Sequence, residues 1–192
     1  MGDTGSRPDS FSARVSDPGR FQVLPETAEE ILDQLAERYV VDRRESKEPT
    51  GPAPGAEVVR TVRLMPRSPA AGPLSIAFTD FPGIVLRLGR WFIEPSPDCG
   101  CDDCAEDPGE LVMSLRAQVL AHVEGGLWER VRRGVTGSWL ETRLIGTGVS
   151  ATRQAPIDPA EARAARREGF AAAVQWDPWT RRAPQRLSRR AG

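Results

Sequence analysis

Three cysteines lie within six residues, at positions 99, 101 and 104, and the chain contains no others. Thiolate is a soft ligand that suits zinc, and three thiolates in one short loop can occupy one face of a coordination tetrahedron. The Cys101-x-x-Cys104 spacing is that of a zinc knuckle, whereas Cys99-x-Cys101 is tighter and less specific. The segment therefore predicts a metal site with Cys99, Cys101 and Cys104 as ligands and zinc as the metal.

The chain has no second pair of cysteines, so a complete tetrahedral site needs a fourth ligand. His122 is the only histidine, but a helix that begins near residue 108 would place it roughly 20 Å along the helix axis. Asp102 and Asp103 are nearer, and a partner chain is another source. We therefore expect Asp102 or Asp103 as the fourth ligand in preference to His122. Three further acids also lie nearby: Asp98, Glu106 and Asp107.

The same thiols allow a redox interpretation, in which two of them cycle between dithiol and disulfide. Reactive thiols are activated by nearby positive charge, but the neighbouring charges in the sequence are five carboxylates. Negative neighbours disfavour the thiolate, and an odd number of cysteines cannot form a closed disulfide framework. A bound cation is therefore favoured over a redox pair, and an inert exposed loop is the remaining alternative.

Two other groups of residues carry weaker functional signals. Trp176 and Trp179 could dock a protein partner, or they could pin the C-terminal segment to the domain by burying their indoles, which is the interpretation we favour. Arg87, Arg90 and Trp91 lie on or beside an expected strand and could line a pocket for an anion. Residues of this kind more often form the solvated face of a sheet.

The charge distribution argues against nucleic acid and membranes as partners. The formal net charge is −1, so no overall field attracts DNA, RNA or an anionic membrane. Residues 181–192 carry five arginines and could contact nucleic acid, but no aromatic platform or recognition motif accompanies them. No stretch reaches the roughly 18 apolar residues of a membrane-spanning helix, and the first 20 residues lack the apolar core of a secretory signal. We expect a cytoplasmic protein with reduced thiols.

Apolar periodicity and helix-capping signals predict one α+β domain. A capping box at Thr27 and Glu30 predicts the start of the first helix. Asp107-Pro108 and Asp158-Pro159 each predict the start of another helix. Alternating apolar residues predict four strands, over residues 58–64, 74–79, 84–92 and 138–145. The element order α-β-β-β-α-β-α favours a mostly antiparallel sheet of about four strands packed against two or three helices.

The expected boundaries follow from composition. A disordered N-terminal tail is expected over residues 1–22 and a disordered arginine-rich tail over residues 181–192. A single α+β domain is expected between them, over residues 23–180. Charges, prolines and glycines predict a flexible loop at residues 43–56, and the cysteine loop is expected at residues 95–107. The second helix is expected to continue weakly past Gly125-Gly126 through Leu127 and Val131.

Four segments together resemble a family of actinobacterial proteins of unknown function. They are Phe81-Pro82-Gly83, the group Arg87, Gly89, Arg90 and Trp91, the cysteine segment 99–104, and Trp176-Asp177-Pro178-Trp179. The resemblance spans about residues 58–182, and the cysteine segment is its most specific part. The family has no established activity, so the resemblance supplies no catalytic residue. It implies a single domain in the bacterial cytosol.

The sequence predicts no particular reaction. The leading hypothesis is a non-enzymatic interaction or accessory module with a zinc-stabilised cysteine loop. One alternative is a thiol-dependent redox enzyme that uses the Cys99, Cys101 and Cys104 cluster. A second alternative is a protein that associates with nucleic acid through its arginine-rich tail, although we expect this partner least.

Overall fold

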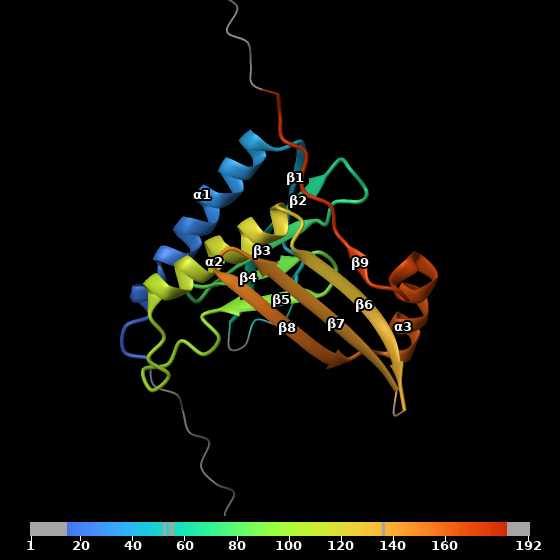
Figure 1. Cartoon of the computed structure of the whole chain (residues 1–192). Coiled ribbons are helices and arrows are strands. Elements are labelled where there is room, and N and C mark those ends of the chain that lie inside the picture. Colours follow the sequence, from blue (N-terminus) through green and yellow to red (C-terminus); the bar gives the residue numbers. More distant parts are fainter. Residues whose placement is uncertain (1–14, 52, 54–55, 136, 184–192) are drawn as a thin grey trace, which may run out of the picture.

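The structure is a computed structural model that describes residues 15–51, 53, 56–135 and 137–183. Two antiparallel sheets and three α-helices make up the described part, which confirms the expected α+β class. Figure 1 shows helix α2 between the two sheets and α1 beside it. The structure contains more strands than the sequence predicts, and they form two sheets instead of one.

The first sheet is an antiparallel meander in the order β1-β2-β3-β4-β5. The expected strand at residues 84–92 is in fact a hairpin, because Gly89 adopts a left-handed φ of +59° and reverses the chain. The expected loop at residues 43–56 is also partly wrong, since residues 43–46 pair with the next strand. The strands are β1 (Val41–Ser46), β2 (Val58–Pro66), β3 (Leu74–Thr79), β4 (Ile84–Leu88) and β5 (Phe92–Ser96).

The three helices are α1 (Val23–Arg38), α2 (Pro108–Val123) and α3 (Pro159–Ala165). The predicted caps of α2 and α3 are confirmed, because the Asp107 side chain accepts from the Glu110 N–H and the Asp158 side chain accepts from the Ala160 N–H. The predicted capping box at Thr27 is wrong, since α1 begins four residues earlier and Thr27 is buried within it. None of the helices in the described ranges has both the length and the apolar character needed to cross a membrane.

The second sheet follows α2 and has the strand order β8-β7-β6-β9. The expected continuation of the second helix is wrong, because the chain turns at Gly125 and then enters β6. Gly126 has no room for a side chain, since a Cβ there would lie 2.0 Å from the Ile145 carbonyl oxygen. The strands are β6 (Leu127–Gly134), β7 (Gly137–Gly146), β8 (Val149–Pro156) and β9 (Val174–Gln175).

The main hydrophobic core lies between the first sheet and the two long helices. Apolar residues alternate along the strands, and the helix-facing set is almost fully buried, as the period of two predicts. Helix α2 also packs against β7 of the second sheet. A smaller cluster of Val131, Ala162, Ala165 and Phe170 joins α3 to the second sheet. The core residues include Leu32, Leu64, Ile76, Leu86 and Leu115.

A part of each expected tail is ordered. Residues 18–21 form a single 3₁₀ turn, and Phe21 is completely buried. At the other end Arg181 bridges to Tyr39, and the Arg182 N–H donates to the Arg38 carbonyl oxygen. The remainder of the expected tails, residues 1–14 and 184–192, lies outside the described residues.

Candidate metal centre

The three cysteine thiols converge on one point in the loop between β5 and α2. Their sulfur atoms all lie within 4.8 Å of one another, and those of Cys99 and Cys101 are 3.0 Å apart. Two sulfurs bound to one tetrahedral zinc ion, with bonds of about 2.3 Å, lie roughly 3.8 Å apart. Cys101 is 5% exposed, whereas Cys99 and Cys104 are exposed. The three thiols are close enough together to hold a metal ion.

Two residues in the left-handed region of backbone conformation tighten this loop. Gly100 has a φ of +70°, and Ala105, which is not a glycine, has a φ of +49°. A Cβ at Gly100 would lie 2.9 Å from the Phe81 ring, so this position needs glycine for space as well as for conformation. The two turns bring Cys99, Cys101 and Cys104 onto one side of the loop.

The Glu106 carboxylate holds the first half of the loop. It accepts hydrogen bonds from the backbone N–H groups of Asp98 (3.0 Å), Cys99 (3.2 Å) and Gly100 (2.9 Å). Burial raises the pKa of Glu106, but the three N–H donors outweigh it and leave that pKa below its ordinary value. Glu106 therefore orders the backbone around Cys99. We assign it this role, and not that of a metal ligand, because both of its carboxylate oxygens already accept backbone hydrogen bonds.

The N-terminal segment packs against the same loop. The Arg20 guanidinium donates to the Cys101 carbonyl oxygen at 3.2 Å, and the Phe21 ring lies 6.0 Å from the Phe81 ring. The Asp102 carboxylate accepts from the Ser16 N–H at 3.1 Å. Sequence reasoning missed Arg20, because 81 residues separate it from Cys101 and no local pattern marks it. Its positive charge partly offsets the surrounding carboxylates, of which Glu106 is one.

The thiols share their protons unequally. Hydrogen bonds from the Cys99 and Cys104 thiols lower the pKa of Cys101. For Cys104 the effect is the opposite. Its hydrogen bond with Cys101, and to a lesser extent that with Cys99, raises the pKa of Cys104 to about 12. These hydrogen bonds therefore favour the thiolate on Cys101 over the thiolate on Cys104. A divalent cation is the kind of partner that would let all three ligate as thiolates.

The predicted fourth ligands are not part of the cluster. In the described residues the group of potential ligand atoms consists of the three thiols, without Asp102, Asp103 or His122. Asp102 is engaged with Ser16. His122 lies in the core with no exposed surface, where its Nε2 donates to the Gly72 carbonyl oxygen at 3.0 Å. Its ring also packs edge-on against Trp179.

The buried histidine leads to a prediction about pH. Burial, opposed by the Gly72 carbonyl, lowers the pKa of His122 to about 4 from an ordinary value of 6.5. The unfolded chain therefore binds a proton between these values and the folded chain does not, so stability falls as the pH is lowered through this window. We expect His122 to contribute roughly 3 kcal/mol to the loss of unfolding free energy between pH 7 and pH 4.

Urea unfolding at several pH values, with wild type beside His122→Gln, measures this contribution. A glutamine amide can still donate to the Gly72 carbonyl but does not titrate. Between pH 4 and 6.5 the unfolding free energy of the variant should fall less steeply with decreasing pH than that of the wild type. The difference in slope should correspond to about one bound proton. Parallel curves for the two proteins would show that His122 is not the titrating group.

The two C-terminal tryptophans are bonded within the fold. Trp179 is 4% exposed, and its indole N–H donates to the Gly72 carbonyl oxygen at 2.9 Å. The Trp176 indole N–H donates to the Glu129 carboxylate at 2.8 Å, and Trp176 packs against both hydrophobic clusters. Together they attach the segment after β9 to β6 through Glu129 and to the segment before β3 through Gly72.

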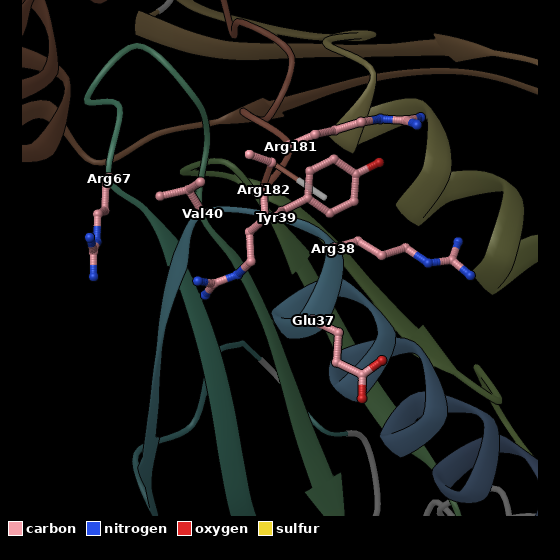
Figure 2. A pocket seen from close by; sticks show the side chains of 8 residues that line it. Glu37, Arg38, Tyr39, Val40, Arg67, Arg181 and Arg182 are labelled. Carbon is pink, nitrogen blue, oxygen red and sulfur yellow. The ribbon is translucent and has the colours of Figure 1, made fainter. Parts of the chain in front are cut away.

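The described start of the arginine-rich segment borders a hollow of about 730 Å³ at the end of α1. Arg67 is paired with Asp42, and Arg182 donates to the Ala36 carbonyl oxygen at 3.2 Å. Figure 2 shows that the Arg38 and Arg67 side chains point to opposite sides of the hollow. These arginines therefore do not converge on a shared ligand position.

Comparisons with known proteins give one match. A family model described as a family of unknown function (DUF6226) matches residues 2–183. Neither the search of curated proteins nor the search of solved structures found a match. The family match covers both the cysteine loop and the two sheets.

Proposed function

Because the chain belongs to this family of unknown function, we propose its role from the cysteine loop: a non-enzymatic interaction or accessory module in which Cys99, Cys101 and Cys104 bind one zinc ion. The observation that carries the proposal is the convergence of the three sulfur atoms within 4.8 Å of one another. Thiolate ligands in a tetrahedral arrangement suit zinc better than magnesium or calcium, which prefer oxygen ligands.

The surroundings of the thiols support a structural role for the ion. Arg20 and Phe21 pack against one side of the loop, and Glu106 orders its backbone. A zinc ion there would tie the N-terminal segment, the β3–β4 turn and the start of α2 to one point. The ion would thus stabilise one end of the domain, which is the usual contribution of a structural zinc site.

The fourth ligand would come from the exposed side of the cluster. Cys99 and Cys104 are both exposed, so water, a side chain of a partner protein or a nearby acid can reach the ion. Of the two acids predicted for this position, Asp103 is exposed and Asp102 is engaged with Ser16. Asp103 therefore needs less rearrangement to become the fourth ligand. A partner ligand would make metal binding part of the interaction itself.

A redox pair is the second candidate. The 3.0 Å separation of the Cys99 and Cys101 sulfurs and the proximity of the Arg20 guanidinium to the loop favour it. In that case two thiols would lose two electrons and two protons to an external disulfide, which would become a dithiol. The third thiol would take no part in that exchange.

Thiol alkylation distinguishes the two candidates, because the chain contains only three cysteines and intact mass counts the labelled thiols directly. Reduced, zinc-loaded protein should resist iodoacetamide at all three positions until a chelator is added, and should then gain three labels. A redox pair predicts rapid labelling of reduced protein with or without the chelator. Labelling that the chelator does not accelerate would contradict the zinc proposal.

A further inference from the structure

The face of the first sheet that points away from α1 carries a row of arginines. In the strand register Arg44 of β1 lies opposite Arg63 of β2, Arg63 lies opposite Ser75 of β3, and Ser75 lies opposite Arg87 of β4. Directly opposite residues of antiparallel strands point to the same face. Three guanidinium groups therefore share one row. Arg44 and Arg63 are direct neighbours, and Ser75 separates Arg63 from Arg87.

These three arginines have no acidic partner in the described part of the chain. Among the residues that the structure describes, no carboxylate lies within ion-pair distance of Arg44, Arg63 or Arg87. Like charges placed directly opposite each other on a sheet are destabilising. The cations of this row therefore gain from a bound anion, in contrast to Arg43 on the other face, which pairs with carboxylates of α1.

A cavity of about 330 Å³ lies beside the part of this row that runs from β2 to β4. Its lining combines the arginines with large apolar and aromatic side chains: Arg63, Met65, Arg87, Arg90, Phe170 and Trp176. Its volume is at the lower end of the range of small-molecule sites, about 300–1,000 Å³. Glu168 also lines it but is paired with Arg90.

Arg87 is held in place without being neutralised. Its Nε (2.8 Å) and its Nη2 both donate to the Arg90 carbonyl oxygen, and its Nη1 donates to the Thr50 carbonyl oxygen at 3.1 Å, which leaves one N–H on each Nη for an anion. Burial, and then the charge of Arg63, lower the pKa of Arg87, while Glu129 and Glu161 oppose this. A fixed, half-buried guanidinium is pre-organised for an anion, since little side-chain entropy is lost on binding.

The aromatic wall offers contacts of a different kind. The Trp176 indole N–H is already used by Glu129, so Trp176 presents its ring to the cavity and no free donor. The Arg90 guanidinium stacks on the Trp91 and Phe170 rings at 4.7 and 5.4 Å from their centroids. This wall suits a flat apolar group, because aromatic faces and edges attract other rings.

We propose that this cavity binds a small phosphate monoester that carries an aromatic ring. The phosphate lies between Arg63 and Arg87, and the ring lies against Trp176 and Phe170. A phosphate dianion matches in charge two guanidinium groups that have no carboxylate partner within the described ranges, and guanidinium N–H groups suit its geometry. The site is separate from the cysteine loop and does not depend on zinc.

Calorimetric titration of the full chain with adenosine 5′-monophosphate tests the proposal, with adenosine and ribose 5-phosphate as partial probes. The nucleotide should bind at least about tenfold more tightly than either partial probe, because each lacks one of the two recognised groups. Arg63→Glu should weaken nucleotide binding by about tenfold or more. Arg133→Glu makes the same charge change at an exposed residue of β6 outside the cavity and should leave it within about twofold.

Three outcomes would overturn the proposal. The first is the absence of nucleotide binding at millimolar concentration. The second is equal loss of binding in the Arg63 and Arg133 variants, which would indicate nonspecific attraction. The third is equal affinity for a partial probe and the nucleotide. Arg63 is exposed, so its variants should fold; an unchanged melting temperature checks this, and Arg63→Ala with the same loss of binding excludes an artefact of the added carboxylate.

Discussion

Glu129→Ala is expected to destabilise the protein by roughly 4 kcal/mol or more, a large share of the stability of an ordinary domain. Glu129 has no exposed surface. One carboxylate oxygen accepts from the Arg90 N–H at 2.9 Å and the Trp176 indole N–H at 2.8 Å, and the other accepts from the Trp91 N–H at 2.7 Å. Alanine would leave three partly buried donors without this acceptor, and each costs about 1–3 kcal/mol.

The contact is important because it joins three parts of the fold. Glu129 lies on β6 of the second sheet, Arg90 and Trp91 form the β4–β5 turn of the first, and Trp176 belongs to the C-terminal segment. Gly89 completes the fit, since a Cβ there would lie 2.6 Å from the Glu129 carboxylate. Loss of the carboxylate should therefore loosen the junction between the sheets as well as β6.

Urea unfolding measures the effect, with two comparison variants. Glu129→Gln keeps one acceptor oxygen but turns an N–H₂ group toward a donor, so it should cost less than alanine, about 1–3 kcal/mol. Glu168→Ala removes a carboxylate that is 54% exposed and pairs with Arg90, and should cost no more than about 1 kcal/mol. If Glu129→Ala unfolded at the same urea concentration as Glu168→Ala, the buried carboxylate would not stabilise the junction between the sheets.

Cys101→Ser is expected to abolish zinc binding and to lower the melting temperature of zinc-loaded protein by roughly 5–10 °C. Cys101 is the most buried of the three thiols, and serine is a poor replacement for a thiolate ligand. A ligand present at a hundred times its dissociation constant stabilises the folded state by about 2.7 kcal/mol. For a chain of this length 1 kcal/mol corresponds to about 2–4 °C.

A chelator provides the matched control for this variant. It should lower the melting temperature of the wild type to about that of Cys101→Ser and should leave the variant unchanged. This pattern would separate loss of the ion from any packing defect of the serine. A chelator effect of equal size on both proteins would show that the chelator acts somewhere other than at the thiols.

Local signals in the sequence were sufficient for part of the fold. The caps at Asp107 and Asp158 are correct because each depends on a side chain and a backbone N–H only two or three residues away. The strands at residues 58–64 and 74–79 are correct because the apolar residues at every second position, such as Val62 and Leu64 or Leu74 and Ile76, are buried in the core. The start of α1 is wrong because burial of Phe21, a contact distant in sequence, lets the helix begin before its capping box.

The second sheet illustrates why the remainder was not predictable. Leu127 and Val131 are spaced by four residues, which also suits a helix, and the buried residue between them is an acid. Nothing near Glu129 in the sequence marks it as buried, since its donors lie 38, 39 and 47 residues away. Such a residue is recognised only when the partner segments are in place.

The candidate sites also differ in whether local sequence is sufficient to predict them. The spacing of the cysteines identifies the thiol cluster, because all three belong to one short loop. Arg20 and the arginine row cannot be found this way, because one depends on a contact over 81 residues and the other on strand register. A one-residue change in register would move Arg63 to the opposite face of the sheet.

Zinc content is the most direct test of the central proposal that the cysteine loop is a metal site. Elemental mass spectrometry should be applied to wild type and Cys101→Ser, each purified under reducing conditions, supplied with zinc and desalted. The proposal predicts about one zinc per wild-type chain and less than about a tenth of that in the variant. Zinc-free wild-type protein, or an equal zinc content in the two proteins, would contradict it.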